Sequence, residues 1–554
     1  MSGDSAISCA PLVVDSVEDL YWDDEADVVV TGFGGAGAVA SIQARELGAS
    51  VIALDRFAGG GATAYSGGVI YSGGTRHQRE SGYEDTAEEM YNYLDAEGNA
   101  VAASTLRRFC EGSNADIEWL ESQGVPYGGK VFEEKTAFPP DGYWIYYSGN
   151  EKMPEFSGVA KPAPRGHRVA RKGFAGAFYY ETLREAALAK GARLLVHSPV
   201  SRLVVSRDNQ VLGVEIKPLP QALWKKHLAL YKVVHPWLPF NGGRAGRAIA
   251  RAKVLELSAS QARLIRARKG VILATGGFNN NIEMLSQHRP VLANNFKKLL
   301  RLGSLGDDGR GIRMAELAGG ATALMENIGV ARTLAPPNVF AHGVIVNQGG
   351  ERFVNEAAYA FVVGSSIIEQ AGGGKAWLLL ESRDFWRGVR QSFFTGGNFL
   401  MWGAPALLNI FFGGSRRANS LAGLARKISV DAAALETTIA EFNQRACHGA
   451  ADPLGKLAEL VKPLKNRPFY AINLSLDNTF SPAQMMTMGG LVVDEDSGAV
   501  KRADGSSITG LYAAGRSAVG ICSNGYMSGL SIADTVFSGR RAGRSAAEIP
   551  WPSR

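Results

Sequence analysis

The sequence predicts an α/β protein with two domains, a larger discontinuous domain and a smaller domain inserted into it. The chain has 554 residues, too many for one ordinary domain, and 46% of them are hydrophobic, which is enough for two cores. Residues 26–56 follow the order strand, glycine-rich turn, helix, strand, and residues 510–543 repeat the order strand, glycine turn, helix near the C-terminus. A domain with parts at both ends of the chain must be discontinuous.

The first βαβ unit carries a dinucleotide-binding fingerprint. The apolar run 27–30 leads into Gly32-x-Gly34-x-x-Gly37, and the next strand ends on Asp55, eighteen residues after the last glycine. Gly32 permits a tight turn, Gly34 lets the backbone approach a pyrophosphate at the helix N-terminus, and Gly37 lets helix and strand pack closely. Asp55 can accept hydrogen bonds from a ribose. These features predict a Rossmann-like domain that binds FAD or NAD.

Later segments decide between the two nucleotides. A second loop rich in Gly, Ser and Thr, residues 59–74, follows the Asp55 strand directly, where a nicotinamide enzyme would continue into the next Rossmann helix. Residues 270–278 read as a late strand that ends in a glycine pair. With the C-terminal unit, these elements resemble the fumarate reductase/succinate dehydrogenase flavoprotein superfamily, which includes the 3-ketosteroid dehydrogenases. The resemblance covers nearly the whole chain and implies FAD.

The resemblance also implies the domain organisation. We expect a Rossmann-like FAD-binding domain of the glutathione-reductase type, with an inserted α+β cap domain over the flavin. Residues 1–320 and 468–554 would form the FAD-binding domain, and residues 321–467 the cap. Residues 304–321 resemble the last helix before the chain crosses into the cap, and residues 489–500 resemble its return.

The residues that hold the cofactor follow from the same resemblance. Gly515 and Arg516 would lie near the flavin, and the N–H groups of Ser531 and Ile532 would face its pyrimidine end, where reduced flavin carries negative charge. Relatives that bond FAD covalently use a histidine in the second loop; Gly61 stands there, so we expect non-covalent FAD. The other expected cofactor residues are Gly32, Gly34, Gly35, Ala36, Gly37, Asp55, Arg56, Ala62, Thr63, Ser66, Gly67, Gly68, Ala274, Thr275 and Gly276.

The segment RFVNEAAYAF, residues 352–361, begins like a substrate-domain signature of this superfamily and then departs from it. Where the family places a proton-donating arginine, the chain has Ala360, preceded by Tyr359. Alanine can neither bind a carboxylate nor deliver a proton, so fumarate or succinate chemistry is not expected. Hydroxyl groups remain as catalysts: Tyr359 on the cap, and Tyr526 and Ser528 in the motif GYMSG at residues 525–529.

This motif, with the PAPRGH segment at residues 162–167, resembles the 3-ketosteroid Δ4-dehydrogenases more closely than the Δ1 enzymes. The resemblance implies that Tyr526 and the Gly529 N–H hold the substrate carbonyl, which acidifies the neighbouring C–H. Ionising a tyrosine of pKa about 10 at pH 7 costs about 4 kcal/mol. We therefore expect a neutral relay in which Ser528 passes the C4 proton toward Tyr359 or solvent, although these two could exchange roles, while hydride leaves C5 for flavin N5.

The predicted activity is the introduction of a C4–C5 double bond into 3-keto-5α- or 5β-steroids. A 3-ketosteroid Δ1-dehydrogenase and an ene-type reductase are the alternatives within the superfamily. A membrane-docked electron-transfer flavoprotein subunit is the alternative of another class, and the set of hydroxyl groups argues against it. No motif identifies the electron acceptor that reoxidises FAD.

The basic character of the chain is local. Residues 217–269 contain twelve basic residues and one acid, Glu256, and so contribute +11, whereas the rest of the chain sums to −5 and the whole chain to +6. Residues 217–253 lie between two segments, 211–216 and 254–257, that alternate like neighbouring strands, so we interpret them as an insertion. A helix over residues 221–235 would have lysines on one side and apolar residues, with Trp224 and Tyr231, on the other, which is typical of contact with an anionic membrane. No nucleic-acid motif accompanies the run, and no nucleic-acid partner is expected.

A second stretch, residues 391–415, has no charged residue and is flanked by arginines. Its length permits a transmembrane helix, but its glycines, Pro405 and its position inside the cap argue against one. A monotopic membrane contact shared by 218–252 and 391–415, a buried lid and a subunit interface are the other interpretations.

The N-terminal sequence and the cysteines indicate the compartment. The first 30 residues carry eight acids and no Lys or Arg, the reverse of a signal peptide. Cys9, Cys110, Cys447 and Cys522 lie far apart, so we expect neither a metal site nor a disulfide framework. We expect a cytoplasmic protein at the inner face of the cell membrane.

Overall fold

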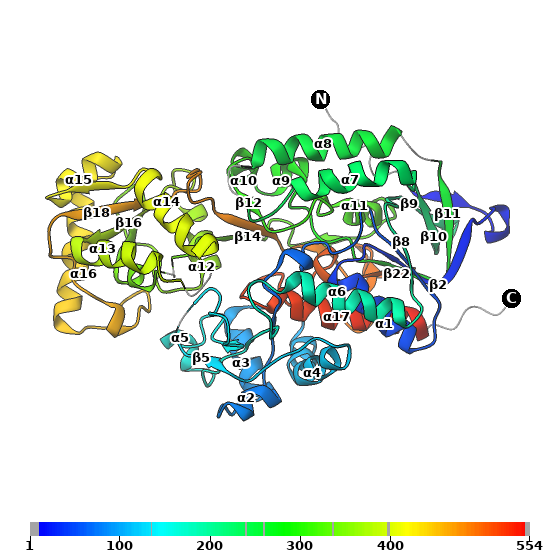
Figure 1. The fold of residues 1–554 in the computed structure, drawn as a ribbon, viewed down its shortest axis with the longest axis horizontal. Coiled ribbons are helices and arrows are strands. Elements are labelled where there is room, and N and C mark those ends of the chain that lie inside the picture. Colours follow the sequence, from blue (N-terminus) through cyan, green and yellow to red (C-terminus); the bar gives the residue numbers. More distant parts are fainter. Residues whose placement is uncertain are drawn as a thin grey trace.

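The computed structural model describes residues 10–134, 136–238, 241–258, 261–334, 337–395 and 399–548. Its centre, within these residues, is a nine-stranded sheet with the order β1-β9-β10-β11-β2-β3-β8, in which β22 also pairs with β11 and β21 with β22 (Figure 1). The strands are β1 (Leu12–Val14), β2 (Asp24–Thr31), β3 (Val51–Leu54), β8 (Arg193–Leu195), β9 (Val200–Ser206), β10 (Val211–Ile216), β11 (Arg263–Leu273), β21 (Ala499–Lys501) and β22 (Ser507–Ala513). Strands β22, β11, β2, β3 and β8 are parallel, as a Rossmann-like fold requires.

Two helices from opposite ends of the chain pack side by side on this sheet. They are α1 (Gly35–Glu46) and α17 (Leu530–Glu548), and α6 (Gly176–Ala189) packs beside α1. The two helices approach closely at Gly539 and Gly543, where an added Cβ would lie 3.0 Å from the Ala36 carbonyl oxygen and 2.5 Å from that of Ala40. This contact joins the N-terminal and C-terminal parts of the predicted nucleotide-binding domain into one layer.

Smaller elements surround the central sheet. A four-stranded sheet has the order β4-β7-β6-β5, with β4 (Val69–Tyr71), β5 (Val131–Phe132), β6 (Ile145–Tyr146) and β7 (Gly166–Arg168). The helices near it are α2 (Arg76–Glu80), α3 (Ala87–Glu97), α4 (Ala103–Ser122) and α5 (Pro154–Ser157). Further along the chain lie α9 (Ile282–His288), α10 (Pro290–Asn294), β12 (Leu300–Arg301), α11 (Arg310–Leu317), β13 (Thr322–Ala323) and β20 (Gly490–Leu491).

The chain between α11 and β20 forms a separate lobe, which we call the cap lobe (Figure 1). Its sheet has the order β15-β16-β18-β17, with β15 (Val344–Val346), β16 (Trp377–Glu381), β17 (Arg416–Ala418) and β18 (Phe469–Asn473), all antiparallel. Its helices are α12 (Ala360–Glu369), α13 (Ser382–Ser392), α14 (Ala404–Phe412), α15 (Leu421–Ile428) and α16 (Ala432–His448). The antiparallel pair β14 (Ile328–Ala331) and β19 (Gln484–Thr487) connects the lobe to the rest of the molecule.

The insertion is longer than predicted. The helix expected over 221–235 is confirmed as α7 (Gln221–Val233), but the strand expected over 254–257 is wrong, because α8 (Gly242–Ser258) continues through it. The partner strand of β10 begins only at Arg263, so the insertion extends to residue 262. The helix continues through residues 254–257 because the buried residues of α8 recur at the helical spacings of three and four. They are Ala245, Ala248, Ala252 and Leu255.

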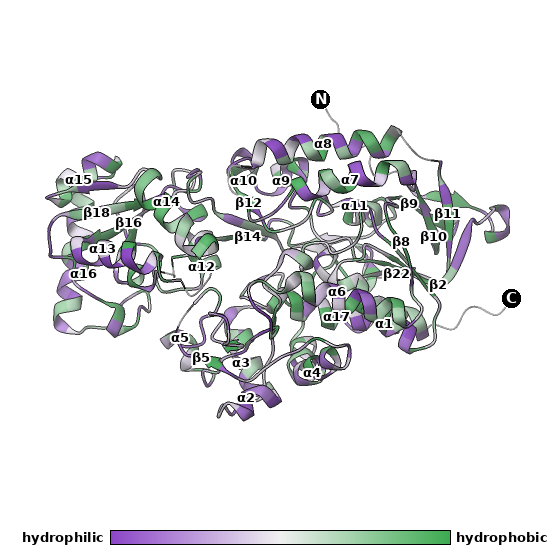
Figure 2. Ribbon diagram, viewed as in Figure 1, coloured by the Kyte–Doolittle hydropathy of each residue, from purple (hydrophilic) through white to green (hydrophobic). Residues whose placement is uncertain are grey.

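The apolar face of α7 packs inward. Tyr231 and Val234 are buried against Phe57 and Leu305 of the nucleotide-binding part, while the lysines of the helix are exposed. Figure 2 shows hydrophilic and hydrophobic residues mixed along both α7 and α8. The predicted amphipathic pattern of α7 is confirmed, but much of the apolar face that we expected to contact a membrane packs against the protein's own core.

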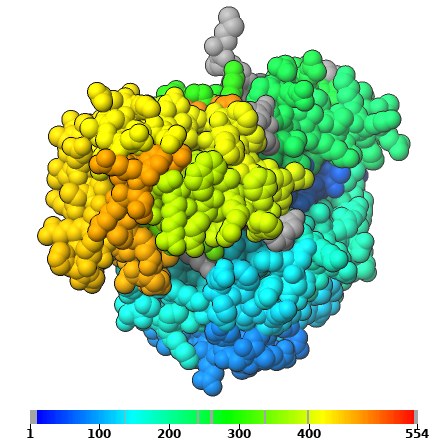
Figure 3. Space-filling model, turned by 60° about the vertical axis from the view of Figure 1, so that its left-hand side comes forward, coloured from blue at the N-terminus to red at the C-terminus, as the bar shows by residue number. Residues whose placement is uncertain are grey.

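The uncharged stretch 391–415 is not one continuous helix. Its described parts are the end of α13, a π-helical turn over Phe399–Gly403 and helix α14, and residues 396–398 lie outside the described residues. No helix among the residues that the structure describes is long and apolar enough to cross a bilayer. In Figure 3 the cap lobe (yellow to orange) and the insertion (green) border the same face of the molecule.

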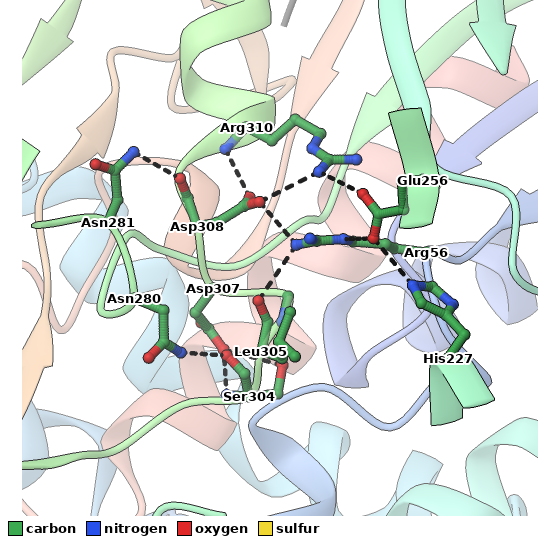
Figure 4. A network of polar contacts seen from close by, with 11 residues as sticks. Arg56, His227, Glu256, Asn280, Asn281, Ser304, Leu305, Asp307, Asp308 and Arg310 are labelled. Atoms are coloured by element: carbon green, nitrogen blue, oxygen red, sulfur yellow. Dashed lines mark hydrogen bonds and ion pairs between the residues drawn. The ribbon is translucent and has the colours of Figure 1, made fainter. Parts of the chain in front are cut away.

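A buried ion-pair network fastens the insertion to the central sheet (Figure 4). Glu256 of α8 lies 2.7 Å from Arg56 Nε, 3.1 Å from Arg310 Nη2 and 3.0 Å from His227 Nε2, and Arg56 Nη1 lies 2.7 Å from Asp308 Oδ2. Burial opposes ionisation of Glu256, but the two arginines outweigh it and hold the pKa of its carboxyl well below the usual range. The one acid of the basic stretch thus forms its main electrostatic link to the rest of the protein.

Replacing Glu256 by glutamine should destabilise the protein. Glu256→Gln leaves Arg56 and Arg310 buried with reduced compensation, and breaking a buried pair in this way costs about 3 kcal/mol of unfolding free energy. Urea unfolding followed by tryptophan fluorescence measures the change. Asp15→Asn, which removes a pair with Arg207 that is exposed by more than half on both sides, is the control and should change stability by less than about 0.5 kcal/mol. Equal effects of the two variants would contradict the assigned role of the network.

Candidate active site

One large cavity extends from the glycine turns of the central sheet to the cap lobe. Most residues predicted to bind the cofactor line it, namely Gly32, Gly34, Gly35, Ala36, Asp55, Arg56, Gly61, Ala62, Thr63, Ser66, Gly67, Ala274, Thr275, Gly276, Gly515, Arg516, Ser531 and Ile532. Gly37 does not line the cavity: an added Cβ would lie 2.0 Å from the Gly32 carbonyl oxygen, so this glycine serves helix–strand packing. Gly68, with φ of 67°, also lies off the wall, where it packs against Ala175.

The turn between β2 and α1 fits a pyrophosphate. Gly32 has φ of 88°, and a Cβ there would lie 2.5 Å from the Ala274 carbonyl oxygen, so only glycine is accommodated. Helix α1 begins directly after Gly34, which caps it without any side-chain hydrogen bond. The Gly35 N–H donates to Thr63 Oγ1 at 3.2 Å, and Gly34, Gly35 and Ala36 line the cavity, so the start of the helix, whose polarity favours an anion, lies at this wall.

Asp55 is held in place for the ribose. Its Oδ1 accepts N–H groups from Phe57 at 2.7 Å and Gly59 at 3.0 Å, and its Oδ2 accepts the Phe33 N–H at 2.9 Å. A carboxylate has about four lone-pair sites, so it retains capacity for a ribose hydroxyl. Arg56 lines the same end of the cavity, and its guanidinium pairs with Glu256 and Asp308.

The opposite end of the cavity fits a flavin. Gly515, with φ of 59°, lets the chain turn beside Ala36, and Arg516 forms a buried ion pair with Asp307. Within the described residues, Arg516 Nη1 is buried without a hydrogen-bond partner, so a donor is available at the cavity wall. Ser531 and Ile532, in the first turn of α17, line this end as well. The residues present therefore fit FAD along the whole cavity.

The three predicted catalytic hydroxyl groups come together in this cavity. The rings of Tyr359 and Tyr526 lie 6.5 Å apart, and Phe361 packs on Tyr526 at 4.6 Å. Ser528 and Gly529 line the cavity beside them. Ala360 also lines it, so a small apolar side chain occupies the position where the superfamily arginine would stand. Residues from the cap lobe and from the C-terminal turn thus meet at one point.

Burial sets the protonation state of these phenols. Loss of solvent raises the pKa of Tyr526 well above 10, and burial together with the neighbouring Tyr526 raises the pKa of Tyr359 as well. A phenolate would be costly here, since the surroundings disfavour the charged form. The hydroxyl groups are therefore suited to act as neutral hydrogen-bond donors.

Backbone contacts position the cluster. Gly529 O accepts the Tyr71 N–H of β4 at 3.1 Å, which fixes the C-terminal turn. The Tyr359 N–H donates to Asn150 Oδ1 at 2.7 Å, which fixes the start of α12 against the neighbouring sheet. The nearest polar partner of Ser528 was not predicted: Tyr146 OH lies 2.8 Å from Ser528 Oγ. No local motif marks Tyr146, because the contact joins residues 382 positions apart.

Much of the remaining wall is apolar, and no group of residues that could hold a metal ion is found in the part of the chain that the structure describes. Apolar and aromatic side chains line the part of the cavity beyond the hydroxyl groups: Phe138, Phe174, Trp237, Leu302, Ala331, Phe361, Trp402 and Met486. Trp237 belongs to the insertion and donates its Nε1–H to Tyr65 O at 2.8 Å. The insertion therefore contributes directly to the cavity wall.

Comparisons with known proteins agree with this geometry. The profile of the FAD binding domain family matches residues 27–531. The chain is 36% identical to the 3-oxo-5-alpha-steroid 4-dehydrogenase of Comamonas testosteroni, over 91% of this chain and 95% of the relative. It is 25% identical to the 3-oxosteroid 1-dehydrogenase of Mycolicibacterium smegmatis, over 93% of this chain and 99% of the relative.

A solved structure extends the comparison. The 3-ketosteroid-delta4-(5alpha)-dehydrogenase from Rhodococcus jostii RHA1, determined in complex with 4-androstene-3,17-dione, superimposes with a TM-score of 0.80 at 31% identity, covering 98% of this chain and 100% of that one. The predicted fold class and the FAD cofactor are confirmed, as is the resemblance that the motifs indicated. The chain therefore belongs to the FAD binding domain family of flavoprotein oxidoreductases, in one family with the 3-oxo-5-alpha-steroid 4-dehydrogenase of Comamonas testosteroni.

Proposed function

We propose that this protein is an FAD-dependent 3-ketosteroid Δ4-dehydrogenase, which introduces the C4–C5 double bond into saturated 3-ketosteroids. The meeting of Tyr359, Tyr526 and Ser528 in an apolar cavity, at the end that fits a flavin, is the observation that carries the proposal. The higher identity to a 4-dehydrogenase than to a 1-dehydrogenase, 36% against 25%, favours this reaction over the Δ1 alternative.

Substrate binding and proton transfer are assigned to different residues. Tyr526 and the Gly529 N–H hold the C3 carbonyl, and their hydrogen bonds strengthen as negative charge develops on the oxygen. Ser528 receives the proton from C4 and passes its own proton to Tyr359, which releases its phenolic proton to solvent, so that no tyrosine has to ionise in the buried cavity. FAD, when bound, supplies the acceptor for the hydride from C5. The apolar walls bind the steroid rings.

The domain organisation is part of the proposal. The boundary expected at 467/468 would separate β18 from the cap sheet, so we place the FAD-binding domain at residues 1–320 and 474–554 and the cap that closes over the flavin at residues 321–473. FAD is bound without a covalent bond, because Gly61 lines the cavity where a covalent histidine would stand. Trichloroacetic acid precipitation tests this point, since non-covalent FAD stays in the supernatant.

Anaerobic titration of the purified flavoprotein tests the reaction. A saturated 3-ketosteroid should bleach the flavin absorbance within one turnover. Bleaching only by a Δ4-3-ketosteroid would instead assign the Δ1 reaction, and bleaching by neither would reject both.

The role of Tyr526 gives a sharper prediction. Tyr526→Phe should retain FAD but reduce its flavin with saturated 3-ketosteroid about 100-fold more slowly, because one donor to the developing oxyanion is lost. Stopped-flow absorbance measures the rate. Tyr127→Phe is the matched control, since Tyr127 is also buried and its hydroxyl has no hydrogen-bond partner among the described residues. Full activity of Tyr526→Phe would reject the site assignment.

We further propose that the cap lobe contacts an anionic membrane surface. Large apolar side chains of residues 391–415 are exposed, among them Phe393, Phe394, Leu400, Phe411 and Phe412 at 54% to 86%. Exposed arginines flank them at 387, 390, 416 and 417. An apolar patch with a basic rim suits a surface of acidic lipids, from which an apolar steroid could also be drawn. The insertion contributes less than its sequence suggested, because α7 turns its apolar face inward.

Vesicle flotation tests the membrane contact. Phe394→Ser combined with Leu400→Ser should weaken binding to phosphatidylglycerol vesicles at least about tenfold, because two apolar side chains leave the acyl boundary. Val13→Ser combined with Tyr21→Ser removes side chains of similar exposure elsewhere and should bind like the parent. Unchanged flotation of the first variant, or a parent that does not float, would contradict the proposal.

A further inference from the structure

Ser528 is held by a segment that the mechanism above does not use. Tyr146, the last residue of β6, places its hydroxyl 2.8 Å from Ser528 Oγ. Two residues further on, Ser148 Oγ donates to the Ser528 carbonyl oxygen at 2.9 Å, and the Ser528 N–H donates to Ser148 O at 3.3 Å. Alternate residues of an extended chain face the same side, so Tyr146 and Ser148 can both form hydrogen bonds with Ser528.

A glycine in the neighbouring strand makes these contacts possible. Gly166 of β7 is paired with Tyr146, and an added Cβ would lie 2.6 Å from Ser148 Cβ and 2.9 Å from the Tyr146 ring. Any side chain at Gly166 would displace both residues that hold Ser528. Gly166 belongs to the PAPRGH segment at residues 162–167. Its lack of a side chain leaves the room that Tyr146 and Ser148 need to reach Ser528.

The chemistry assigns a direction to the hydrogen bond. A phenol is a stronger acid than an aliphatic alcohol, so Tyr146 is the better donor and Ser528 Oγ the acceptor. Burial raises the pKa of Tyr146, which keeps this donor protonated throughout the neutral range. With one lone pair occupied by Tyr146, the other lone pair of Ser528 Oγ remains for the C4 proton, and the Ser528 proton is directed to another acceptor.

We propose that Tyr146 is a positioning residue that orients and polarises the Ser528 hydroxyl for removal of the C4 proton. The inference rests on the proposed function. As the C4–H bond breaks and the O–H bond forms, Ser528 gives its own proton to Tyr359, which releases its phenolic proton to solvent. The Tyr146 hydrogen bond stabilises the partial negative charge on Oγ as the serine proton leaves. Tyr146 does not line the cavity, and its hydroxyl contacts Ser528 Oγ.

Packing alone does not account for the hydroxyl group. The Tyr146 ring is fully buried beside Val69 and Phe138, and a phenylalanine would fill the same space. The change Tyr146→Phe therefore removes the hydrogen bond and keeps the packing. Tyr179→Phe is the matched control, because Tyr179 is also fully buried and its hydroxyl has no partner among the described residues.

Stopped-flow flavin reduction by a saturated 3-ketosteroid, unlabelled or deuterated at C4, tests the proposal. For Tyr146→Phe we expect unchanged FAD content, a steroid Kd within about twofold of the parent, and a reduction rate about 10- to 100-fold lower. The C4 isotope effect should rise, since proton removal becomes the slower step, and Tyr179→Phe should match the parent. A parental rate and isotope effect in Tyr146→Phe would overturn the proposal.

Two further variants separate the possible failures. Ser528→Ala reports on the proposed function: if it reduces its flavin normally, the site assignment itself fails, whereas an inactive Ser528→Ala beside a normal Tyr146→Phe rejects only the role of Tyr146. Incorporation of 3-fluorotyrosine at position 146, a more acidic phenol of nearly the same size, covers a folding defect of Tyr146→Phe. Because its hydroxyl is still a hydrogen-bond donor, this variant should reduce its flavin at a rate close to the parent's, and a rate as low as that of Tyr146→Phe would overturn the proposal.

Discussion

The site depends on one backbone contact, between Gly529 of the C-terminal turn and Tyr71 of β4. The Tyr71 N–H donates to Gly529 O at 3.1 Å, while Gly529 has φ of 96° and leaves no room for a Cβ, which would lie 2.7 Å from the Tyr71 nitrogen. The turn that is fixed in this way carries Tyr526 and Ser528 and leads directly into α17. This close approach of two backbones thus fixes the hydroxyl groups of Tyr526 and Ser528 relative to the start of α17.

Desolvation then decides what these hydroxyls can do. In water a tyrosine has a pKa of about 10, and burial raises the pKa of Tyr359 and Tyr526 further. The same apolar walls that suit a steroid therefore prevent charge on the catalytic groups. A relay of neutral hydroxyls suits such a cavity, and the small apolar side chain of Ala360 lines it beside them.

The insertion shows how a charge pattern can mislead when its environment is unknown. Residues 217–269 are strongly basic, yet their single acid, Glu256, is buried between Arg56 and Arg310 and fastens α8 to the central sheet. The apolar side of α7 packs onto Phe57 and Leu305 instead of facing outward. The insertion still exposes Val254 and Leu257, but more large apolar side chains are exposed in residues 391–415, so the proposed membrane contact rests mainly on this second segment.

The sequence alone was sufficient to predict features that are properties of a short stretch of backbone. The turn at Gly32, the carboxylate of Asp55 and helix α7 are each encoded in a short stretch of sequence, because glycine conformation and helical periodicity are local. The hydroxyls of GYMSG were instead identified by the resemblance of that motif to the 3-ketosteroid dehydrogenases. The tertiary structure alone decided the extent of α8, the pairing of Arg56 with Glu256 and the contact of Tyr146 with Ser528. These depend on packing between residues up to 382 positions apart, for which no local pattern is required.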